Sequence, residues 1–166
     1  MSNDRLPLPL ALLDQLSLHE IWLVSYGGAG RRLWLENADL AGVDLGGRLL
    51  EQALLTGVVL DGARLADADL TGATLSSASL VGCDLGGARL SHAQLDHASL
   101  RGARLAGAAA LGASFFGADL CGADLRGANL RDACLCAARL EGALLDGADF
   151  GGACVDAIGA GTVAAR

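Results

Sequence analysis

Residues 63–102 read, in groups of five, ARLAD ADLTG ATLSS ASLVG CDLGG ARLSH AQLDH ASLRG. The third residue of every group is Leu, the first is Ala or Cys, and the fifth is most often Gly. The same period runs without insertion from Leu35 to Val155, with changes in identity only at Ala110, Phe115 and Phe150 before its end. An internal repeat of this kind is typical of solenoid proteins.

A five-residue period fits neither a regular helix nor a regular strand. Steps of five on a helix advance about 140° and would spread the leucines over every side, whereas strand alternation would place successive leucines on opposite faces. The period fits if each pentapeptide is a short extended piece followed by a turn. Ala68 and Leu70 then point inward together, Asp69 points outward, and Thr71 and Gly72 turn the corner. Repeated in one sense, such turns wind the chain into a stacked coil.

The motif A(D/N)LxG occurs as ADLTG at 68–72, ADLCG at 118–122, ADLRG at 123–127 and ANLRD at 128–132. It resembles the pentapeptide repeat family over about three quarters of the chain. The resemblance implies an all-β solenoid: a right-handed quadrilateral parallel β-helix with four pentapeptides in each coil and hence about six coils. One series of outward residues alternates in charge at every fourth pentapeptide, as stacked coils of this length would favour: Asp44, Arg64, Asp84, Arg104 and Asp124.

The chain outside the repeats suggests three parts: an N-terminal segment at 1–32, the β-helix at 33–158 and a short C-terminal tail at 159–166. Within the first part we expect a capping helix at about 9–26, with Pro9 in its first turn. One face of this helix would carry Leu12, Leu16, His19, Leu23 and Tyr26. Ser17 and Glu20 also spell a capping box, so two short helices meeting near Ser17 remain an alternative. A cap would cover the open edge that a solenoid otherwise exposes.

The first coils carry apolar side chains in outward positions. We expect the capping helix to cover this patch, which consists of Trp34, Leu49, Leu54 and Val59. Arg48 falls in an inward position, where an unpaired charge is costly. The sequence therefore predicts either a local distortion at 46–50 or an ion pair of Arg48 with Glu51 or with an acidic residue of the cap.

Ala110 replaces one leucine of the core, and Phe115, the next inward residue, is expected to fill the space. Leu111 and Phe116 lie beside them in outward or corner positions. This pair has two interpretations: scattered surface residues, or a contact site for a partner.

Composition limits the function. The chain has 166 residues, enough for one domain, and a net charge of −7 without any lysine. This charge argues against nucleic-acid binding, which leaves a basic footprint. No apolar run approaches the roughly 18 residues of a membrane span, and the apolar stretch at 6–13 is a poor signal sequence because Asp14 ends it. We expect a cytoplasmic protein that contacts neither membrane nor nucleic acid.

No constellation of catalytic residues stands out. Of the three histidines, His19 lies in the expected cap and His92 and His97 lie at successive corners. No nucleophile has a base and an orienting acid, and no glycine loop leads into a helix to bind phosphate. The glycines occupy corners. We therefore expect a protein that is not an enzyme and uses no cofactor.

The cysteines allow several interpretations. Cys83 takes the place of an inward Ala. Cys134 and Cys154 are four pentapeptides apart and should stack at about 4.8 Å, with Cys136 and Asp156 beside them. A zinc site is disfavoured because outward side chains of a flat sheet do not converge, and a disulfide between Cys134 and Cys154 is disfavoured in a reducing compartment. The prediction is free surface thiols, including Cys121.

The C-terminal end of the repeats should leave an exposed edge lined by Phe150, Val155 and Ile158. Family members dimerise through this end, so the resemblance implies a homodimer. The alternative is a monomer whose tail folds over the end.

Two functional hypotheses follow. The first is a non-enzymatic interaction or scaffold protein that presents the flat faces of a rigid rod to a protein partner. The second, implied by the resemblance, is a DNA mimic that protects or inhibits a type II topoisomerase such as DNA gyrase or topoisomerase IV against quinolone-like or natural-product poisons. Its acidic face would consist of Asp39, Asp44, Asp61, Asp84, Asp119, Asp124, Glu141 and Asp146. Five arginines interrupt that face: Arg64, Arg101, Arg104, Arg126 and Arg139.

Overall fold

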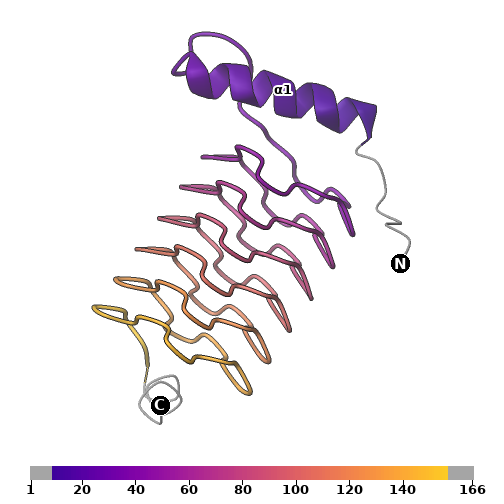
Figure 1. Ribbon diagram of the computed structural model, residues 1–166. Coiled ribbons are helices and arrows are strands. Elements are labelled where there is room, and N and C mark those ends of the chain that lie inside the picture. The colour runs from indigo at the N-terminus through magenta and orange to yellow at the C-terminus, as the bar shows by residue number, and fades with distance from the viewer. Residues whose placement is uncertain (1–8, 157–166) are drawn as a thin grey trace.

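The computed structural model describes residues 9–156 of the chain. Its one helix within that range, α1 (Leu10–Val24), lies across the N-terminal end of a stack of similar coils (Figure 1). The coils follow one another away from α1 in chain order, so the polypeptide forms a rod with a helical cap. No helix among residues 9–156 is long and apolar enough to cross a membrane.

Helix α1 is continuous through Ser17, so the alternative of two short helices is wrong. Pro9 is the N-cap, and the helix gives way to a turn at Ser25. Tyr26 and Gly27 then adopt left-handed φ values of 53° and 84°, which ends the helix. Tyr26 therefore lies beyond the helix and is 99% exposed instead of sharing its buried face.

Each pentapeptide contains one tight turn. In a representative repeat the Ala53 N–H donates to the Leu50 carbonyl at 3.0 Å, and Gln52, the third residue of the turn, has a φ of 58°. This combination is typical of a type II turn. Gly occupies the same position in most repeats, as in Gly72 with a φ of 65°, because it adopts this conformation without steric cost.

Successive coils are joined in parallel at a register of four pentapeptides. Thr74, for example, bridges both Leu54 and Gln94, with the Leu75 N–H donating to the Gln94 carbonyl at 2.7 Å and the Gln94 N–H donating to the Ala73 carbonyl at 2.9 Å. The register matches the coil of four pentapeptides that the resemblance implied. The pairing consists of isolated bridges and not of extended strands within residues 9–156, because a pentapeptide leaves little extended chain between its turns.

The bridges form four rows of outward residues, which we number in chain order. Row 1 contains Trp34, Leu54, Thr74, Gln94, Ser114, Cys134 and Cys154. Row 2 contains Asp39, Val59, Ser79, Ser99, Asp119 and Arg139. Row 3 contains Asp44, Arg64, Asp84, Arg104, Asp124 and Leu144. Row 4 contains Leu49, Asp69, Arg89, Ala109, Asn129 and Asp149.

The inward residues form one continuous apolar core. The leucines from Leu60 to Leu105 and the small residues that precede them are all at most 1% exposed. Ala110 is equally buried and Phe115 is fully buried in the next inward position, so the inward position predicted for both is confirmed. Each buried Leu contributes roughly 1.5–3 kcal/mol to folding.

The capping helix was expected to cover the outward apolar patch, but it does not. Trp34 is 68% and Leu49 42% exposed, and Leu54 and Val59 are half-buried. Helix α1 lies over the end of the coil and not along its side (Figure 1), so Leu12 and Leu16 join the core, and His19 is buried beneath the helix as well.

Polar contacts attach α1 to the first coils. The Leu33 N–H donates to His19 Nδ1 at 3.0 Å, and the Arg48 guanidinium lies 3.6 Å from the Glu20 carboxylate. The predicted ion pair of Arg48 with an acid of the cap is thus confirmed. The predicted distortion at 46–50 is wrong, because the turn there is regular and the Arg48 N–H donates to the Leu45 carbonyl at 3.1 Å.

Candidate interaction surface

The Asp of the repeat motif has a structural task. Its carboxylate accepts the N–H two residues further on, as from Gly46 to Asp44 at 3.0 Å and from Gly86 to Asp84 at 3.1 Å. The Asn129 side chain accepts from Arg131 N–H in the same way at 3.1 Å. These contacts satisfy a backbone donor at the corner, which explains the choice of Asp or Asn in the motif without any partner.

Row 3 of the predicted acidic face is largely paired with arginine. Arg64 lies 3.2 Å from Asp44, and Arg104 lies 4.0 Å from Asp84, one coil away in each case. Arg126 donates two hydrogen bonds to Asp124, at 2.9 and 2.8 Å. These hydrogen bonds outweigh burial and lower the pKa of Asp124 to about 2.

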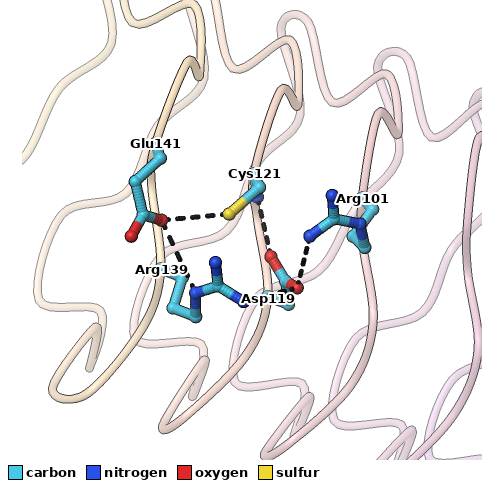
Figure 2. Close-up of polar contacts among 5 residues, drawn as sticks. All are labelled: Arg101, Asp119, Cys121, Arg139 and Glu141. Carbon is cyan, nitrogen blue, oxygen red and sulfur yellow. Dashed lines mark hydrogen bonds and ion pairs between the residues drawn. The ribbon is translucent and has the colours of Figure 1, made fainter.

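Row 2 and its neighbouring corner contain a connected polar cluster (Figure 2). The Asp119 carboxylate lies 2.9 Å from Arg101 and 3.3 Å from Arg139, and it accepts the Cys121 N–H at 3.1 Å. The Cys121 thiol donates to Glu141 at 3.0 Å, and Arg139 also lies 3.7 Å from Glu141. Two carboxylates and two guanidinium groups therefore compensate each other.

The same cluster sets two pKa values. Burial raises the pKa of Asp119, but hydrogen bonds from Cys121 and Arg101 outweigh it and lower the value to about 2. Burial, together with hydrogen bonds to the Asp119 and Glu141 carboxylates, raises the pKa of the Cys121 thiol to about 11. A thiol that stays protonated at neutral pH is a poor nucleophile.

The remaining acids of the predicted face are also engaged. Asp39 accepts the Ala41 N–H at 3.0 Å, and Asp61 accepts the Val81 N–H at 3.0 Å and the Ser79 hydroxyl at 2.5 Å. Asp124 raises the pKa of Arg126 most, and the negative charge of Asp146 raises it further. The structure thus places all eight acids on rows 2 and 3 and their corners, together with the five arginines named above. These thirteen residues alone have a net charge of 5 − 8 = −3.

Row 1 differs from the other three rows because it contains no charged residue. Trp34 at its N-terminal end is 68% exposed. Leu111 and Phe116, at the two corners of one coil on either side of Ser114 in row 1, are 37% and 43% exposed. The His97 ring packs edge-on against Phe116 at 5.4 Å. Row 1 itself is therefore uncharged and has aromatic side chains at its end and at one corner. The corners beside it also carry charged residues such as Asp96, whose carboxylate accepts a hydrogen bond from the Ser114 hydroxyl.

Sequence reasoning missed a second kind of contact between coils. Besides the bridges between equivalent residues of successive coils, corner side chains meet outward side chains of the next coil at a sequence separation of 18. Examples are Ser79 with Asp61, Ser114 with Asp96, Arg101 with Asp119 and Arg131 with Asp149. The first corner residue follows the bridge residue by two positions, so the period gives the separation of 18 but not which side chains lean far enough to meet.

The cysteines follow this second separation. Cys136 and Cys154, 18 residues apart with Cα atoms at 6.0 Å, form a disulfide. The prediction of free thiols is therefore wrong for these two, and the alternative that paired Cys134 with Cys154 named the wrong partner. Cys83, Cys121 and Cys134 are free, and burial raises the pKa of Cys83 to about 12. Residues 9–156 contain no group of three or more side chains arranged to bind a metal ion.

The predicted dimer end is described only in part. Phe150 and Val155 are half-buried, whereas Ile158 lies outside the described residues. At the opposite end a groove of about 300 Å³ lies beside α1, lined by Gln15, Leu18, Arg31, Arg32, Leu33 and Trp34. Its Arg32 already donates to the Gln52 carbonyl at 2.5 Å and lies over the Trp22 ring.

The repeats match a known family model. The model for pentapeptide repeats, in 8 copies, matches residues 38–76, 68–107, 78–120 and 123–156, which is more than half of the chain. The chain belongs to the pentapeptide repeat family, whose members form right-handed quadrilateral β-helices. A search of curated protein sequences found no match.

Solved structures of the same kind are similar to it. The pentapeptide repeat protein alr5209 from Nostoc PCC 7120 is 30% identical, with 84% of this chain and 93% of that one covered and a TM-score of 0.46. A pentapeptide repeat protein of the Arabidopsis thaliana thylakoid lumen is 35% identical over 61% of this chain and 71% of that one, with a TM-score of 0.39. QnrB1, a plasmid-mediated fluoroquinolone resistance protein, is 19% identical over 80% of this chain and 98% of that one, with a TM-score of 0.34.

Proposed function

We propose that this protein is a non-enzymatic binding protein, a rod of about six coils that contacts a protein partner through row 1. The observation that supports this proposal is the distribution of charge. Rows 2, 3 and 4 carry ion pairs and carboxylates, and row 1 carries neither. Burying charged groups in an interface costs desolvation energy, and the cores of protein interfaces are depleted in charge. Row 1 is the side of the rod that a partner can cover at the lowest cost.

Two exposed aromatic residues supply anchors for such a contact. Trp34 stands at the end of row 1 near α1, and Phe116 stands at a corner of row 1 near its middle. Binding energy in protein interfaces concentrates in residues of this kind, Trp above all. The contact-site interpretation of Leu111 and Phe116 is therefore part of this proposal.

The test compares two charge insertions in the same coil. Gln94→Arg places a cation in the middle of row 1, and Ser99→Arg places the same cation in row 2. A benzophenone cross-linker introduced at Thr74, in cells that make the protein naturally, reports the partner in the two backgrounds. We expect Gln94→Arg and Phe116→Glu to abolish the cross-linked product and Ser99→Arg to leave it unchanged. Equal loss with both arginine substitutions, or no loss with either, would contradict the proposal.

The second candidate is a DNA mimic acting on DNA gyrase or topoisomerase IV. The clustering of eight acidic residues on two adjacent sides favours it, and the five arginines among them oppose it, because a mimic needs a continuous negative field. A supercoiling assay with gyrase, with and without a quinolone, tests it directly. If a tenfold excess of the protein neither inhibits supercoiling nor rescues it from the quinolone, this candidate is eliminated.

We also propose a homodimer formed through the C-terminal end, supported by the incomplete burial of Phe150 and Val155; Ile158 was predicted to belong to the same surface. Light scattering at micromolar concentration should give twice the monomer mass of 16.7 kDa, and Phe150→Asp should restore the monomer mass. A monomer mass for the unmodified chain would refute the dimer.

A cytoplasmic location without cofactor, membrane or nucleic-acid contact remains a prediction, as does the division of the chain at residues 32 and 158.

A further inference from the structure

The last described coil is held differently from those before it. Cys154 has a bridge to Cys134 on one side, and no described residue bridges it on the other. Its inward residues are only partly buried, whereas the equivalent residues of the interior coils are fully buried. These partly buried residues are Ala148, Phe150, Ala153 and Val155. Within residues 9–156 this coil therefore has inter-coil contacts on one side only, which makes it the first candidate for local opening in that range.

The disulfide joins this coil to its neighbour. Cys136 stands at a corner of the preceding coil and Cys154 stands in row 1 of the last one. Next to the disulfide in both coils, the Ala137 N–H donates to the Asp156 carboxylate at 2.7 Å. Elsewhere the described contacts at a separation of 18 are hydrogen bonds or ion pairs. The covalent version occurs only at the last coil among residues 9–156.

Solvent can reach this sulfur site. Cys154 is exposed, and Cys134 and Cys136 are half-buried, so a small thiol can approach the bond. Cys134 remains a free thiol and is at once the bridge partner of Cys154 and the second residue before Cys136. The two other free cysteines do not compete, because Cys83 is buried in the core and the Cys121 thiol is hydrogen-bonded to Glu141.

We propose that Cys134, Cys136 and Cys154 form a thiol–disulfide redox site that fastens the last coil when oxidised and releases it when a dithiol reduces the bond. In the reductive step one thiolate of the dithiol attacks a sulfur of the Cys136–Cys154 bond and its second thiolate resolves the mixed disulfide. The dithiol becomes a disulfide, and two electrons and two protons pass from it to Cys136 and Cys154, which become thiols. A disulfide-bearing oxidant of the same class reverses the step.

Cys134 gives the site an internal exchange reaction. Its thiolate attacks Cys154 Sγ, the Cys136–Cys154 bond breaks, a Cys134–Cys154 bond forms, and Cys136 leaves as a thiolate that takes up a proton. No electrons are gained or lost overall. Both linkages close the last coil onto the one before it: the first joins a corner to row 1, and the second joins two neighbours within row 1.

Peptide mapping tests the covalent part. Trypsin cleaves after Arg131 and Arg139, so the disulfide should join peptides 132–139 and 140–166. We expect this joined pair in the unreduced full-length protein and in the matched control Cys134→Ser, and its loss in Cys154→Ser. Cys136→Ser should retain a joined pair through Cys134. Complete alkylation of all five cysteines without reductant would overturn the proposal, and the absence of a joined pair in Cys136→Ser would overturn the exchange step.

Amide hydrogen exchange tests the structural consequence. With dithiothreitol, we expect exchange in residues 141–156 to accelerate by about tenfold or more, while residues 60–120 stay unchanged. Cys121→Ser, outside the site, should respond as the unmodified chain does, and Cys154→Ser should exchange rapidly with or without dithiothreitol. Exchange that is indifferent to the reductant in the unmodified chain would overturn the role of the bond as a fastener.

Discussion

The two ends of the described rod solve the same problem by different means. At the N-terminal end α1 places Leu12 and Leu16 over the first coil, and both are at most 5% exposed. At the C-terminal end the last coil keeps Phe150 and Val155 half-buried, and a disulfide links it to its neighbour. A stack of coils is apolar along its whole axis, so each end needs some closure, whether by added apolar surface or by a covalent bond.

The largest contrast should lie between the interior and the C-terminal end. Leu90 is fully buried with a coil on each side, so Leu90→Ala should lower the free energy of unfolding by about 2–5 kcal/mol. Phe150→Ala should cost distinctly less, although it removes a larger side chain, because Phe150 is already partly exposed. Chemical denaturation of both variants at low protein concentration measures the difference. Equal losses would show that the last coil is as well packed as the interior.

The N-terminal end should resemble the interior more than the C-terminal end does. Leu16 is 2% exposed under α1, and Leu16→Ala should lower the free energy of unfolding by about 2–3 kcal/mol. The matched control is Leu10→Ala on the same helix, because Leu10 is 81% exposed and should change stability little. If both substitutions have the same small effect, α1 does not close the core.

Acid should weaken the N-terminal end. Burial lowers the pKa of His19 below its ordinary 6.5, outweighing the raising effect of the Glu51 backbone, and Nδ1 accepts the Leu33 N–H as part of a neutral ring. As the pH falls below about 6.5, the unfolded chain takes up this proton before the folded chain, so stability is full above that pH and decreases below it.

Thermal unfolding between pH 5 and 8 measures this effect. His19→Asn keeps an acceptor near the position of Nδ1 but does not titrate, so its melting temperature should fall less than that of the unmodified chain on acidification. Parallel pH profiles for the two proteins would argue that His19 is not the group responsible.

The smallest effect should come from the ion pair between the cap and the coil. Arg48 and Glu20 are separated by 3.6 Å, with 37% and 41% of their side chains exposed, and exposed pairs contribute about 0.2–1 kcal/mol. A double-mutant cycle with Arg48→Gln and Glu20→Gln should yield a coupling in this range that shrinks at high salt. A coupling that is insensitive to salt would indicate that another contact carries it.

Much of the fold could be predicted from the sequence because one side chain decides it. A Leu in every pentapeptide can be buried only by turning the chain after each one. The coil of four pentapeptides was implied by the resemblance to the pentapeptide repeat family, and the charge alternation from Asp44 to Asp124 agreed with it. The position of α1 could not be predicted in the same way. Its buried residues were identified, but the helix covers the end of the core instead of Trp34 and Leu49, since periodicity gives the face of a helix and not its direction in space.

The candidate sites were predictable only as positions. The row of each outward residue follows from its number, so the uncharged row 1 was available in the sequence. The direction in which a side chain points between coils does not follow from its residue number. For that reason the partner of Cys154 was misassigned and the pairing of Arg101 with Asp119 was missed. The sequence alone determined the period, the core and the order of outward residues, because these depend on local spacing. Only the tertiary structure decided which neighbours meet across coils, because that depends on how each corner side chain leans toward the next coil.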